Sequence, residues 1–379
     1  MIAVIADDLS GAAELAGVAA QQGHRAEVHT IFDPRTDAEI VAIDTDTRCR
    51  SAAEAARIVA GVTAAVLAAK PAWVFKKTDS VLRGNVRSEI DAILSVTGRR
   101  RALLIPANPS KNRVIRGGVY VIDGVPLAQT TFAQDPEHPR RTSVVAELLA
   151  PAGFPDSLLV PDAVCAGDIA ARAAEVDANT LPAGGVDFFE AILKSKRVAK
   201  ACARQSGLAP ISFANSRPTL FVCGSAAAWD NSRAAECAAY GIPVVPMPEL
   251  IFNGQAAAAA MEAWCAEASN ALHDNGRAML AIGRHTISPG APGIASSQLI
   301  DRLAEAVAGV LAAEKVERLC LEGGATAAAV IRRSGWTRMT ALPTELPGAA
   351  ALSVVGGPLL LIKPGSYLWP RGVLVHDAR

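Results

Sequence analysis

The feature that most constrains the fold is a repeated alternation of short apolar runs with longer helix-like segments. Runs such as Ile2–Ala6 and Ile40–Asp44 are rich in strand-forming residues, and Ala-rich segments with helical periodicity separate them. Strands that alternate with helices along a chain typically form parallel sheets covered by helices. The sequence therefore predicts an α/β fold of two α/β domains, with mainly parallel sheets and a cleft between them.

One segment interrupts this alternation near the middle of the chain. Residues 206–218 read SGLAPISFANSRP, a composition of Gly, Pro, Asn and Ser that is typical of linkers. We therefore expect a first domain over residues 1–205, a linker over residues 206–218 and a second domain over residues 219–379. Within the first domain, Gly118–Thr130 is expected to form a β-hairpin, and Gly184-Gly185 to open a long helix to about Arg204.

The stretch WVFKKTDSVLRGN, residues 73–85, places a polar cluster between a strand-like run ending at Phe75 and a helix-like pattern. Open α/β sheets bind their ligands at the carboxyl ends of their strands. The basic side chains of this cluster can hold an anion, and Asp79 can accept a proton from a hydroxyl group. The alternative is a solvated turn in which Asp79 or Ser80 caps the next helix.

The residues that follow the predicted strands differ between the two halves of the chain. In the first half they are charged, as in Asp7-Asp8, residues 44–48, 76–83 and 108–113. In the second half they are small, as in GSAA at 224–227, GRHT at 283–286 and EGGAT at 322–326. Glycines before a helix let backbone N–H groups approach a phosphate. One half thus suits a charged small molecule and the other a phosphate-bearing one, which favours phosphoryl transfer across the cleft.

Composition and missing motifs exclude several classes of protein. The chain has 37 Lys and Arg and 37 Asp and Glu residues, so no net field attracts nucleic acid or an anionic membrane. No apolar run reaches the roughly 18 residues of a membrane span. The patterns G-x-x-x-x-G-K-[ST], G-x-S-x-G and H-E-x-x-H are missing. The dinucleotide pattern G-x-G-x-x-G is missing too, which argues against a nicotinamide oxidoreductase.

The seven cysteines are scattered and contain no C-x-x-C pattern. Several lie within apolar runs, where a reduced cysteine behaves as a small hydrophobic residue. Asp7 and Asp8 fall where a signal peptide needs an uncharged apolar core, so we expect none. We therefore expect a cytoplasmic protein. The six histidines show no metal-ligand spacing, and a homo-oligomer is left open.

Four segments of the first half resemble the sugar-binding N-terminal domain of the four-carbon acid sugar kinases. They are ADDLSGAAE (6–14), DTDTR (44–48), KKTDSVLRGN (76–85) and the segment from PANPSKNR to Gly117. The later GSA, GGAT, ELPGAA and KPGSY segments resemble the nucleotide-binding C-terminal domain of that family. The resemblance extends over nearly the whole chain and keeps the order and spacing of the motifs.

The resemblance implies an enzyme of carbohydrate metabolism, a transferase that phosphorylates the terminal hydroxyl group of a four-carbon sugar acid. The acid would be of the threonate, erythronate or 3-oxo-tetronate type, with ATP and Mg²⁺ as cofactors. The residues that the resemblance assigns to the sugar acid are Asp8, Arg48, Lys76, Lys77, Thr78 and Asp79, and we add Asp7 and Arg83 as further candidates. Those that it assigns to ATP are Ser225, Gly323, Gly324, Gly348 and Gly365, and we add Glu322 and Thr326 as further candidates for the nucleotide site.

Physical chemistry suggests a role for several of these residues. The Arg48 guanidinium group can hold a carboxylate through two parallel hydrogen bonds, with Lys77 or Arg83 assisting. Asp79, or failing that Asp8, is the expected base for the attacking hydroxyl group. The glycine turns and Mg²⁺ would position and neutralise the triphosphate.

Structural alternatives remain for two of the motifs. Asp7 and Asp8 can serve in helix capping alone, and Gly323-Gly324 can serve in tight packing of a helix on a sheet. The chain also departs from the family pattern, because Ala325 stands where the family has the aspartate of GGDTA. Glu322 can supply the missing carboxylate to Mg²⁺ from a neighbouring position. The other possibility is a non-catalytic sensor of sugar acid and nucleotide, derived from such a kinase.

Overall fold

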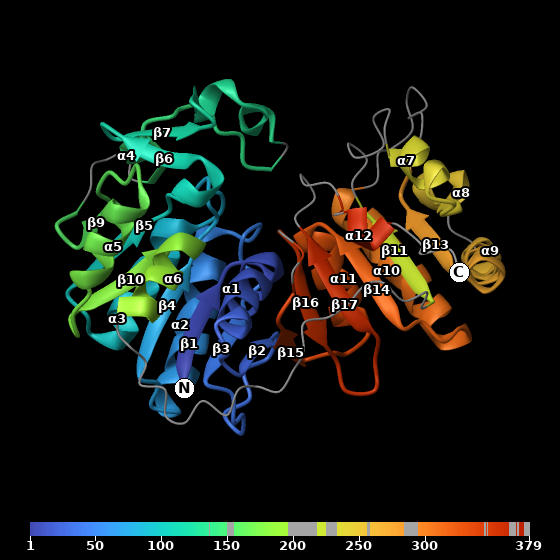
Figure 1. Ribbon diagram of the computed structural model, residues 1–379, viewed down its shortest axis with the longest axis horizontal. Coiled ribbons are helices and arrows are strands. Elements are labelled where there is room, and N and C mark those ends of the chain that lie inside the picture. Colours follow the sequence, from blue (N-terminus) through green and yellow to red (C-terminus); the bar gives the residue numbers. More distant parts are fainter. Residues whose placement is uncertain are drawn as a thin grey trace. The chain divides into compact units, whose positions relative to one another are not determined.

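The computed structural model describes residues 1–135, 137–149, 155–195, 218–224, 233–255, 258–283, 295–344, 346, 348–363, 369 and 371–374. The chain divides into two compact units, unit 1 (Met1–Gly207) and unit 2 (Leu208–Arg379) (Figure 1). Apart from Pro218, the predicted linker lies outside the described residues. The predicted cleft and domain boundaries stay predictions.

Unit 1 is built on a parallel sheet with the strand order β2-β3-β1-β4-β10-β5-β9. Its strands are β1 Ile2–Ala6, β2 Ala26–His29, β3 Ile40–Asp44, β4 Trp73–Lys77, β5 Arg101–Ile105, β9 Leu158–Leu159 and β10 Thr180–Gly184. Its helices are α1 Leu9–Gln21, α2 Ala52–Ala68, α3 Val86–Thr97, α4 Val145–Leu149, α5 Ala166–Ala174 and α6 Val186–Ser195. The connections β1-α1-β2 and β3-α2-β4 run in opposite directions along the sheet, so right-handed crossovers place α1 and α2 on opposite faces.

A small antiparallel sheet follows β5 in the chain and uses the order β6-β7-β8. It consists of β6 Arg113–Arg116, β7 Val119–Ile122 and β8 Val125–Pro126, with the 3₁₀ turns η1 Pro109–Lys111, η2 Leu127–Gln129 and η3 Thr131–Gln134 around it. The predicted hairpin is confirmed in its turn, because β7 and β8 are joined by Asp123 and Gly124, whose φ angles of 50° and 81° suit a tight hairpin turn. It is shorter than predicted, since β8 ends at Pro126. Strand β6 adds a partner that the sequence did not predict.

Two strands of unit 1 differ from the prediction. Strand β4 runs to Lys77 rather than ending at Phe75, and its last residues pair in register with Ile5 and Ala6 of β1. Strand β10 was not predicted, and it contains Pro182, a residue that is unusual inside a sheet. It is tolerated here since β10 pairs with β4 only through Ala183 and Gly184.

The predicted long helix begins two residues later than expected. Gly184 is the last residue of β10, with a φ of 144°, and a Cβ atom there would lie 2.0 Å from the carbonyl oxygen of Ile105. The helix itself, α6, starts at Val186, and its predicted continuation beyond Ser195 lies outside the described residues.

Unit 2 has the strand order β12-β13-β11-β14-β17-β16-β15. Its strands are β11 Thr219–Cys223, β12 Val244–Pro246, β13 Arg277–Ala281, β14 Arg318–Glu322, β15 Arg338–Leu342, β16 Ala350–Ser353 and β17 Leu359–Lys363. Its helices are α7 Arg233–Ala239, α8 Glu249–Phe252, α9 Ala258–Asn275, α10 Ser296–Ala313, α11 Gly324–Arg333 and α12 Arg371–Leu374. Pairing is parallel from β12 to β17, while β16 and β15 are antiparallel additions. The predicted fold class of two α/β domains with mainly parallel sheets is confirmed.

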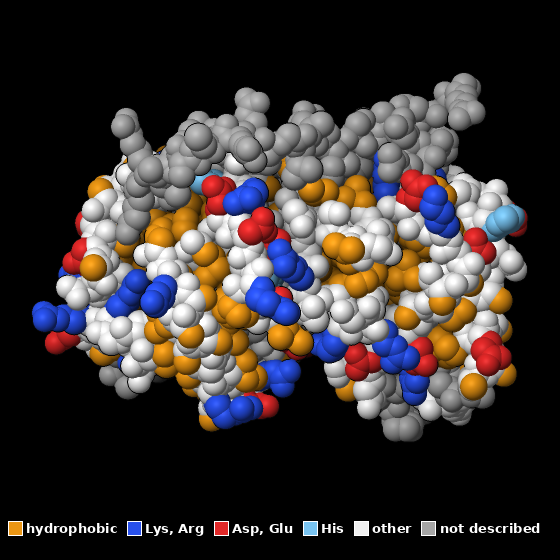
Figure 2. Space-filling model, turned by 90° about the horizontal axis from the view of Figure 1, so that it is seen from below, with side chains coloured by type: hydrophobic (Ala, Val, Ile, Leu, Met, Phe, Trp, Pro, Cys, Tyr) orange, Lys and Arg blue, Asp and Glu red, His pale blue; other side chains and the backbone are white. Residues whose placement is uncertain are grey.

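The surface matches the balanced composition. Basic and acidic side chains of the described residues are interspersed on the face shown in Figure 2. Among the described residues, no helix combines the length and the apolar character that crossing a membrane requires.

Candidate functional site

The carboxyl ends of β1, β3 and β4 bring three of the predicted segments together. Strand β1 lies between β3 and β4 and pairs in parallel with both, so Asp7-Asp8, residues 44–48 and residues 76–83 leave the sheet at one edge. The connections diverge on either side of β1, which makes this edge the switch point where open α/β sheets bind ligands. We call it the charged edge of unit 1.

Arg48 lies at the centre of the charged edge. Its Nε donates to Oδ2 of Asp7 at 2.7 Å and its Nη1 to Oδ2 of Asp8 at 2.8 Å, with Oδ1 of Asp79 at 3.7 Å. Burial by itself would lower the pKa of Arg48, but the charges of these three carboxylates raise it well above its usual value. Sequence analysis assigned the Arg48 guanidinium group to a substrate carboxylate. In the structure, carboxylates of the protein already neutralise its positive charge.

Asp79 is held by the backbone and side chain of its own turn. Oδ2 accepts from the backbone N–H groups of Val81 and Arg83 at 3.0 and 3.2 Å and from Arg83 Nε at 3.1 Å. Oδ1 accepts from Arg83 Nη2 at 2.9 Å. Burial would raise the pKa of Asp79, yet the charges of Arg48 and Arg83 outweigh it and hold the pKa well below its usual range. The solvated-turn alternative is wrong, because Asp79 is buried and Asn85 is the N-cap of α3.

Asp7 and Asp8 do more than cap a helix. Asp8 is the N-cap of α1 and accepts from Gly11 N at 2.8 Å through Oδ1, while its other oxygen binds Arg48. Asp7 is only 3% exposed, and its Oδ1 has no hydrogen-bond partner among the described residues. The hydroxyl oxygen of Thr78, which directly follows β4, is likewise buried and unpartnered in the described part of the chain. Buried polar atoms are normally hydrogen-bonded, so this edge has unused capacity for a polar ligand.

The two lysines of β4 lie in different surroundings. Lys76 is fully buried and its Nζ lies 2.5 Å from Oε2 of Glu89 on α3, whose Oε1 accepts from Thr47. Lys77 lies beside Gly11 of α1, and its Nζ is 3.3 Å from Oε2 of Glu14. The structure therefore places Lys76 beneath the charged edge and Lys77 at it.

Glu14 and Lys111 belong to the charged edge although the sequence assigned them no role. Glu14 accepts from Lys111 Nζ at 2.6 Å and pairs with Lys77. Burial would raise the pKa of Glu14, but the two lysines lower it to about 2. The signal available in the sequence was its position on α1, three residues after Gly11 and so close to the same face of the helix.

Residues 135 and 137–141, which follow the small antiparallel sheet, also contact the charged edge. Oδ2 of Asp135 accepts from Arg83 Nη1 at 3.0 Å, and Nε2 of His138 lies 3.1 Å from the carbonyl oxygen of Arg48. The ring of Phe132, just before this segment, lies 5.7 Å from the guanidinium carbons of both Arg83 and Arg113. We call residues 131–135 and 137–142 the covering segment.

The carboxyl ends of β11, β14 and β17 form the corresponding edge in unit 2. Gly323, with a φ of 94°, is the N-cap of α11 and its N–H donates to the carbonyl oxygen of Lys363 at 2.9 Å. A Cβ atom on Gly224 would lie 2.0 Å from Oγ1 of Thr326 in the first turn of α11. Gly224 therefore serves tight packing, whereas a Cβ atom on Gly323 would make an ordinary contact of 3.7 Å with Oγ1 of Thr326. The N-terminus of α11 is bordered by backbone, as a phosphate site requires.

Glu322 is buried and paired with a lysine. Its Oε2 lies 3.2 Å from Nζ of Lys363, the residue opposite it in β17, and both side chains are almost fully buried. Gly348 precedes β16, whose first residue pairs with Ile362, so it lies at the same edge as Lys363. Ser225 and Gly365 lie outside the described residues.

Comparison with known families gives a match in each unit. Residues 2–203, more than half of the chain, match the sugar-binding N-terminal domain, and residues 220–367 match the nucleotide-binding C-terminal domain. The chain belongs to the four-carbon acid sugar kinase family.

The chain is similar in sequence to several named kinases of this family. A D-erythronate kinase of Heliobacterium modesticaldum is 36% identical over 155 residues, and a D-threonate kinase of Salmonella typhimurium is 35% identical over 150 residues. Each of these matches spans 39% of this chain and only 35% and 36% of the respective relative. A 3-oxo-tetronate kinase of Methylobacterium radiotolerans is 26% identical, with 96% of this chain and 95% of that relative covered.

Solved structures support the fold of this family member. A Salmonella typhimurium LT2 protein superposes with a TM-score of 0.76 at 18% identity, covering 98% of this chain and 97% of that one. A Haemophilus influenzae protein superposes with a TM-score of 0.69 at 17% identity, with 98% of both chains covered. At these identities the likeness concerns the fold alone.

Proposed function

We propose that this kinase transfers the γ-phosphoryl group of ATP to the terminal hydroxyl group of a four-carbon sugar acid. The names of its relatives, kinases of D-erythronate, D-threonate and 3-oxo-tetronate, support the class of substrate. The observation in the structure that carries the proposal is a pair of buried oxygens at the charged edge, on Asp7 and Thr78, which have no hydrogen-bond partner among the residues that the structure describes. A hydroxyl-rich ligand can donate to the first and exchange a hydrogen bond with the second.

The charged edge offers both kinds of partner that a sugar acid needs. Carboxylate oxygens of Asp7 and Asp8 accept hydrogen bonds from hydroxyl groups, while Lys77 and Arg83 donate to the acid group. Arg48 acts chiefly by holding Asp7 and Asp8 in place, because its Nε and Nη1 already donate to them. Binding then depends on how the acid competes with these internal pairs, which gives the edge selectivity for a compact anion.

Asp8 is better suited than Asp79 to accept the proton of the attacking hydroxyl group. Asp79 accepts four hydrogen bonds, three of them from Arg83, whereas Asp8 accepts one from Gly11 and one from Arg48. The lowered pKa of Asp79 also makes it a weak base. Asp79 is then the residue that keeps Arg83 in position.

The edge of unit 2 fits a triphosphate. The first turn of α11 has backbone N–H groups without partners inside the helix, and such groups can bind a phosphate. ATP would bring Mg²⁺ with its phosphates, since Mg²⁺ usually binds through phosphates and one or two carboxylates. Glu322 is the predicted carboxylate, and its pairing with Lys363 means that a cation would compete with that lysine.

The alternative is a sensor that binds both ligands without transfer. Ala325 in place of the family aspartate and the neutralising Glu322–Lys363 pair favour it, because both reduce the negative charge available to Mg²⁺. A sensor would be stabilised by the sugar acid and by ATP yet would form no ADP.

A coupled assay of ADP formation over a panel of tetronates, with ATP and Mg²⁺, separates the two functions. The kinase forms ADP with at least one tetronate, and Asp8→Asn lowers kcat by about 10²-fold or more. Asn still caps α1, so thermal melting should show an intact fold. Asp79→Asn should instead raise KM more than it lowers kcat. Binding of a tetronate without ADP formation at any enzyme concentration would establish the sensor, and an unchanged kcat in Asp8→Asn would exclude Asp8 as the base.

A further inference from the structure

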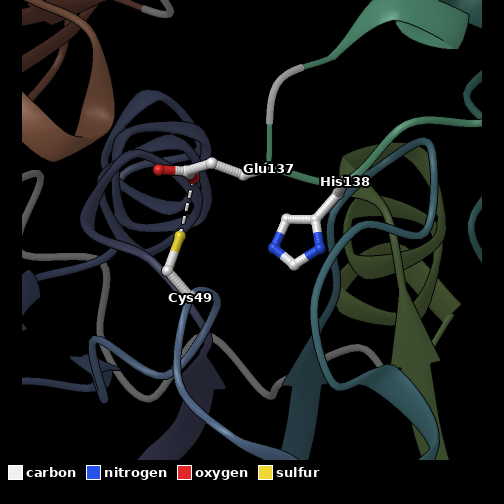
Figure 3. A group of neighbouring side chains, drawn as sticks. All are labelled: Cys49, Glu137 and His138. Carbon is white, nitrogen blue, oxygen red and sulfur yellow. Dashed lines mark hydrogen bonds between the residues drawn. The ribbon is translucent and has the colours of Figure 1, made fainter. Parts of the chain in front are cut away.

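Three side chains with metal-binding atoms meet next to the charged edge. Cys49 follows Arg48 directly, while Glu137 and His138 lie on the covering segment (Figure 3). One ligand atom from each, the thiol sulfur, a carboxylate oxygen and an imidazole nitrogen, lies within 4.8 Å of the other two. Cys49 Sγ donates to Oε2 of Glu137 at 2.8 Å. The three atoms therefore already border a common space in the structure.

We propose that Cys49, Glu137 and His138 form a binding site for Zn²⁺. Thiolate, imidazole and carboxylate are the ligands that Zn²⁺ uses in proteins, and three protein ligands with a fourth, open position make a common zinc geometry. With bonds of about 2.0–2.3 Å, neighbouring ligands of a tetrahedral zinc lie roughly 3.3–3.8 Å apart. The Cys49–Glu137 separation of 2.8 Å would have to widen slightly to reach that spacing. The other separations, at most 4.8 Å, would shorten by about 1 Å or less. Cys49 and Glu137 are exposed and His138 is half-buried, which leaves their side chains room to adjust.

The ligand set discriminates against the Mg²⁺ that the proposed kinase reaction would use. Mg²⁺ prefers oxygen ligands and octahedral geometry, whereas sulfur and nitrogen ligands favour Zn²⁺. On binding, the Cys49 thiol releases its proton to solvent and forms the Zn–S bond, and the hydrogen bond to Glu137 is lost. The imidazole ligates through the nitrogen that carries no proton. Charge and protons balance without any further reactant.

A zinc ion at this site would tie the covering segment to the loop after β3. That loop carries Arg48, and the covering segment carries Asp135, the partner of Arg83. Zinc would therefore restrain the segment that overlies the charged edge, next to the residues assigned to the sugar acid. The site itself does not depend on the proposed kinase reaction, so its test needs no activity.

Titration of the metal-free, full-length protein with Zn²⁺, followed by calorimetry or by competition with a chromophoric chelator, tests the proposal. We expect one equivalent of Zn²⁺ per chain that excess Mg²⁺ does not displace. Cys49→Ser and His138→Gln should each weaken binding by about tenfold or more. Cys165→Ser is the matched control, because Cys165 is another exposed cysteine of unit 1 and should not matter.

Co²⁺ provides a second measurement on the same proteins. Wild type and Cys165→Ser should show a thiolate-to-cobalt charge-transfer band that Cys49→Ser lacks. Circular dichroism should show that all variants are folded, and Glu137→Gln offers a further variant that leaves the cysteine intact. Zinc binding of unchanged stoichiometry and affinity in both Cys49→Ser and His138→Gln would overturn the proposal, as would its loss in Cys165→Ser.

Discussion

Neighbouring carboxyl groups at the charged edge are kept in different protonation states by the residues around them. Burial raises the pKa of Asp44 to about 8, helped by the charges of Asp8, Asp46 and Asp7 and opposed by a backbone hydrogen bond from Asp46. Asp79 is buried as well, but its two arginines keep it ionised. One edge of one sheet thus holds a carboxyl group that stays protonated near neutral pH and another that does not.

Asp44 should make the protein less stable as the pH rises. In the unfolded chain Asp44 ionises near pH 4, while in the fold it keeps its proton to about pH 8. The folded state therefore binds more protons between these values, and stability falls as the pH rises through this window. Asp44→Asn removes the effect and keeps the acceptor for Asp46 N, so from pH 5 to pH 8 the variant should gain roughly 2–4 kcal/mol relative to wild type. Urea unfolding of both proteins at several pH values measures this. The prediction is contradicted if the free energy of unfolding changes with pH in the same way in wild type and in Asp44→Asn.

Removing one partner of the buried Lys76–Glu89 pair should lower the free energy of unfolding far more than removing one partner of a surface pair. Lys76→Met leaves Glu89 buried without its cation, which typically costs about 3–5 kcal/mol. The double variant Lys76→Met/Glu89→Gln should recover part of this loss, because no charge is left unpaired. Lys194→Met is the control, since the Lys194–Glu190 pair of 2.7 Å has its lysine side chain 67% exposed and its loss should cost about 0–1 kcal/mol. Equal losses of unfolding free energy in Lys76→Met and Lys194→Met would refute this account.

At the scale of secondary-structure elements, the end of β11 and the first turn of α11 fit together only because Gly224 lacks a side chain. Gly224→Ala would place its Cβ 2.0 Å from Oγ1 of Thr326 and should lower the free energy of unfolding by about 1–3 kcal/mol. It should also weaken ATP binding, because the N-terminus of α11 is displaced. Thermal melting and a titration with an ATP analogue measure the two effects.

Two further variants test whether the clash with Thr326 causes the loss of stability in Gly224→Ala. Thr326→Ala in the Gly224→Ala background removes the clashing oxygen and should restore most of the stability. Gly61→Ala provides the contrast, since Gly61 lies within α2 with nothing within 4 Å of a Cβ atom, and should stabilise the protein by about 0.5–1 kcal/mol. No recovery in the double variant would mean that the clash is not the source of the loss.

On the scale of the whole molecule, the two ligands should protect different units. A ligand present at about 100 times its Kd stabilises the state that it binds by about 2.7 kcal/mol. In amide hydrogen exchange, a tetronate should therefore slow exchange at the charged edge of unit 1. A non-hydrolysable ATP analogue should slow exchange around Gly224 and Gly323–Thr326 in unit 2. Protection of unit 2 by the tetronate alone, or of unit 1 by the analogue alone, would contradict the assignment of the two sites.

The amino-acid sequence by itself determined the fold class and several members of the charged edge, though not Glu14 or Lys111. The period of hydrophobic residues is local information, so strands such as β1 and β3 and helices such as α2 can be read from it. The meeting of Asp7-Asp8, Arg48 and Asp79 was predictable too, because carboxyl ends of parallel strands share one edge. The resemblance to the kinase family followed from these same segments.

Tertiary structure alone decided which side chain each of these residues contacts. Lys76 is buried because Glu89 reaches it from α3, and Pro182 lies inside the sheet because β10 meets β4 through only two residues. Cys49 and Glu137 are 88 residues apart, yet their side chains touch. Such contacts depend on how distant segments pack, and local hydrophobic pattern carries no information about them. The sequence therefore specified the fold class and the kinds of side chain at the charged edge, and tertiary packing specified which side chains contact one another.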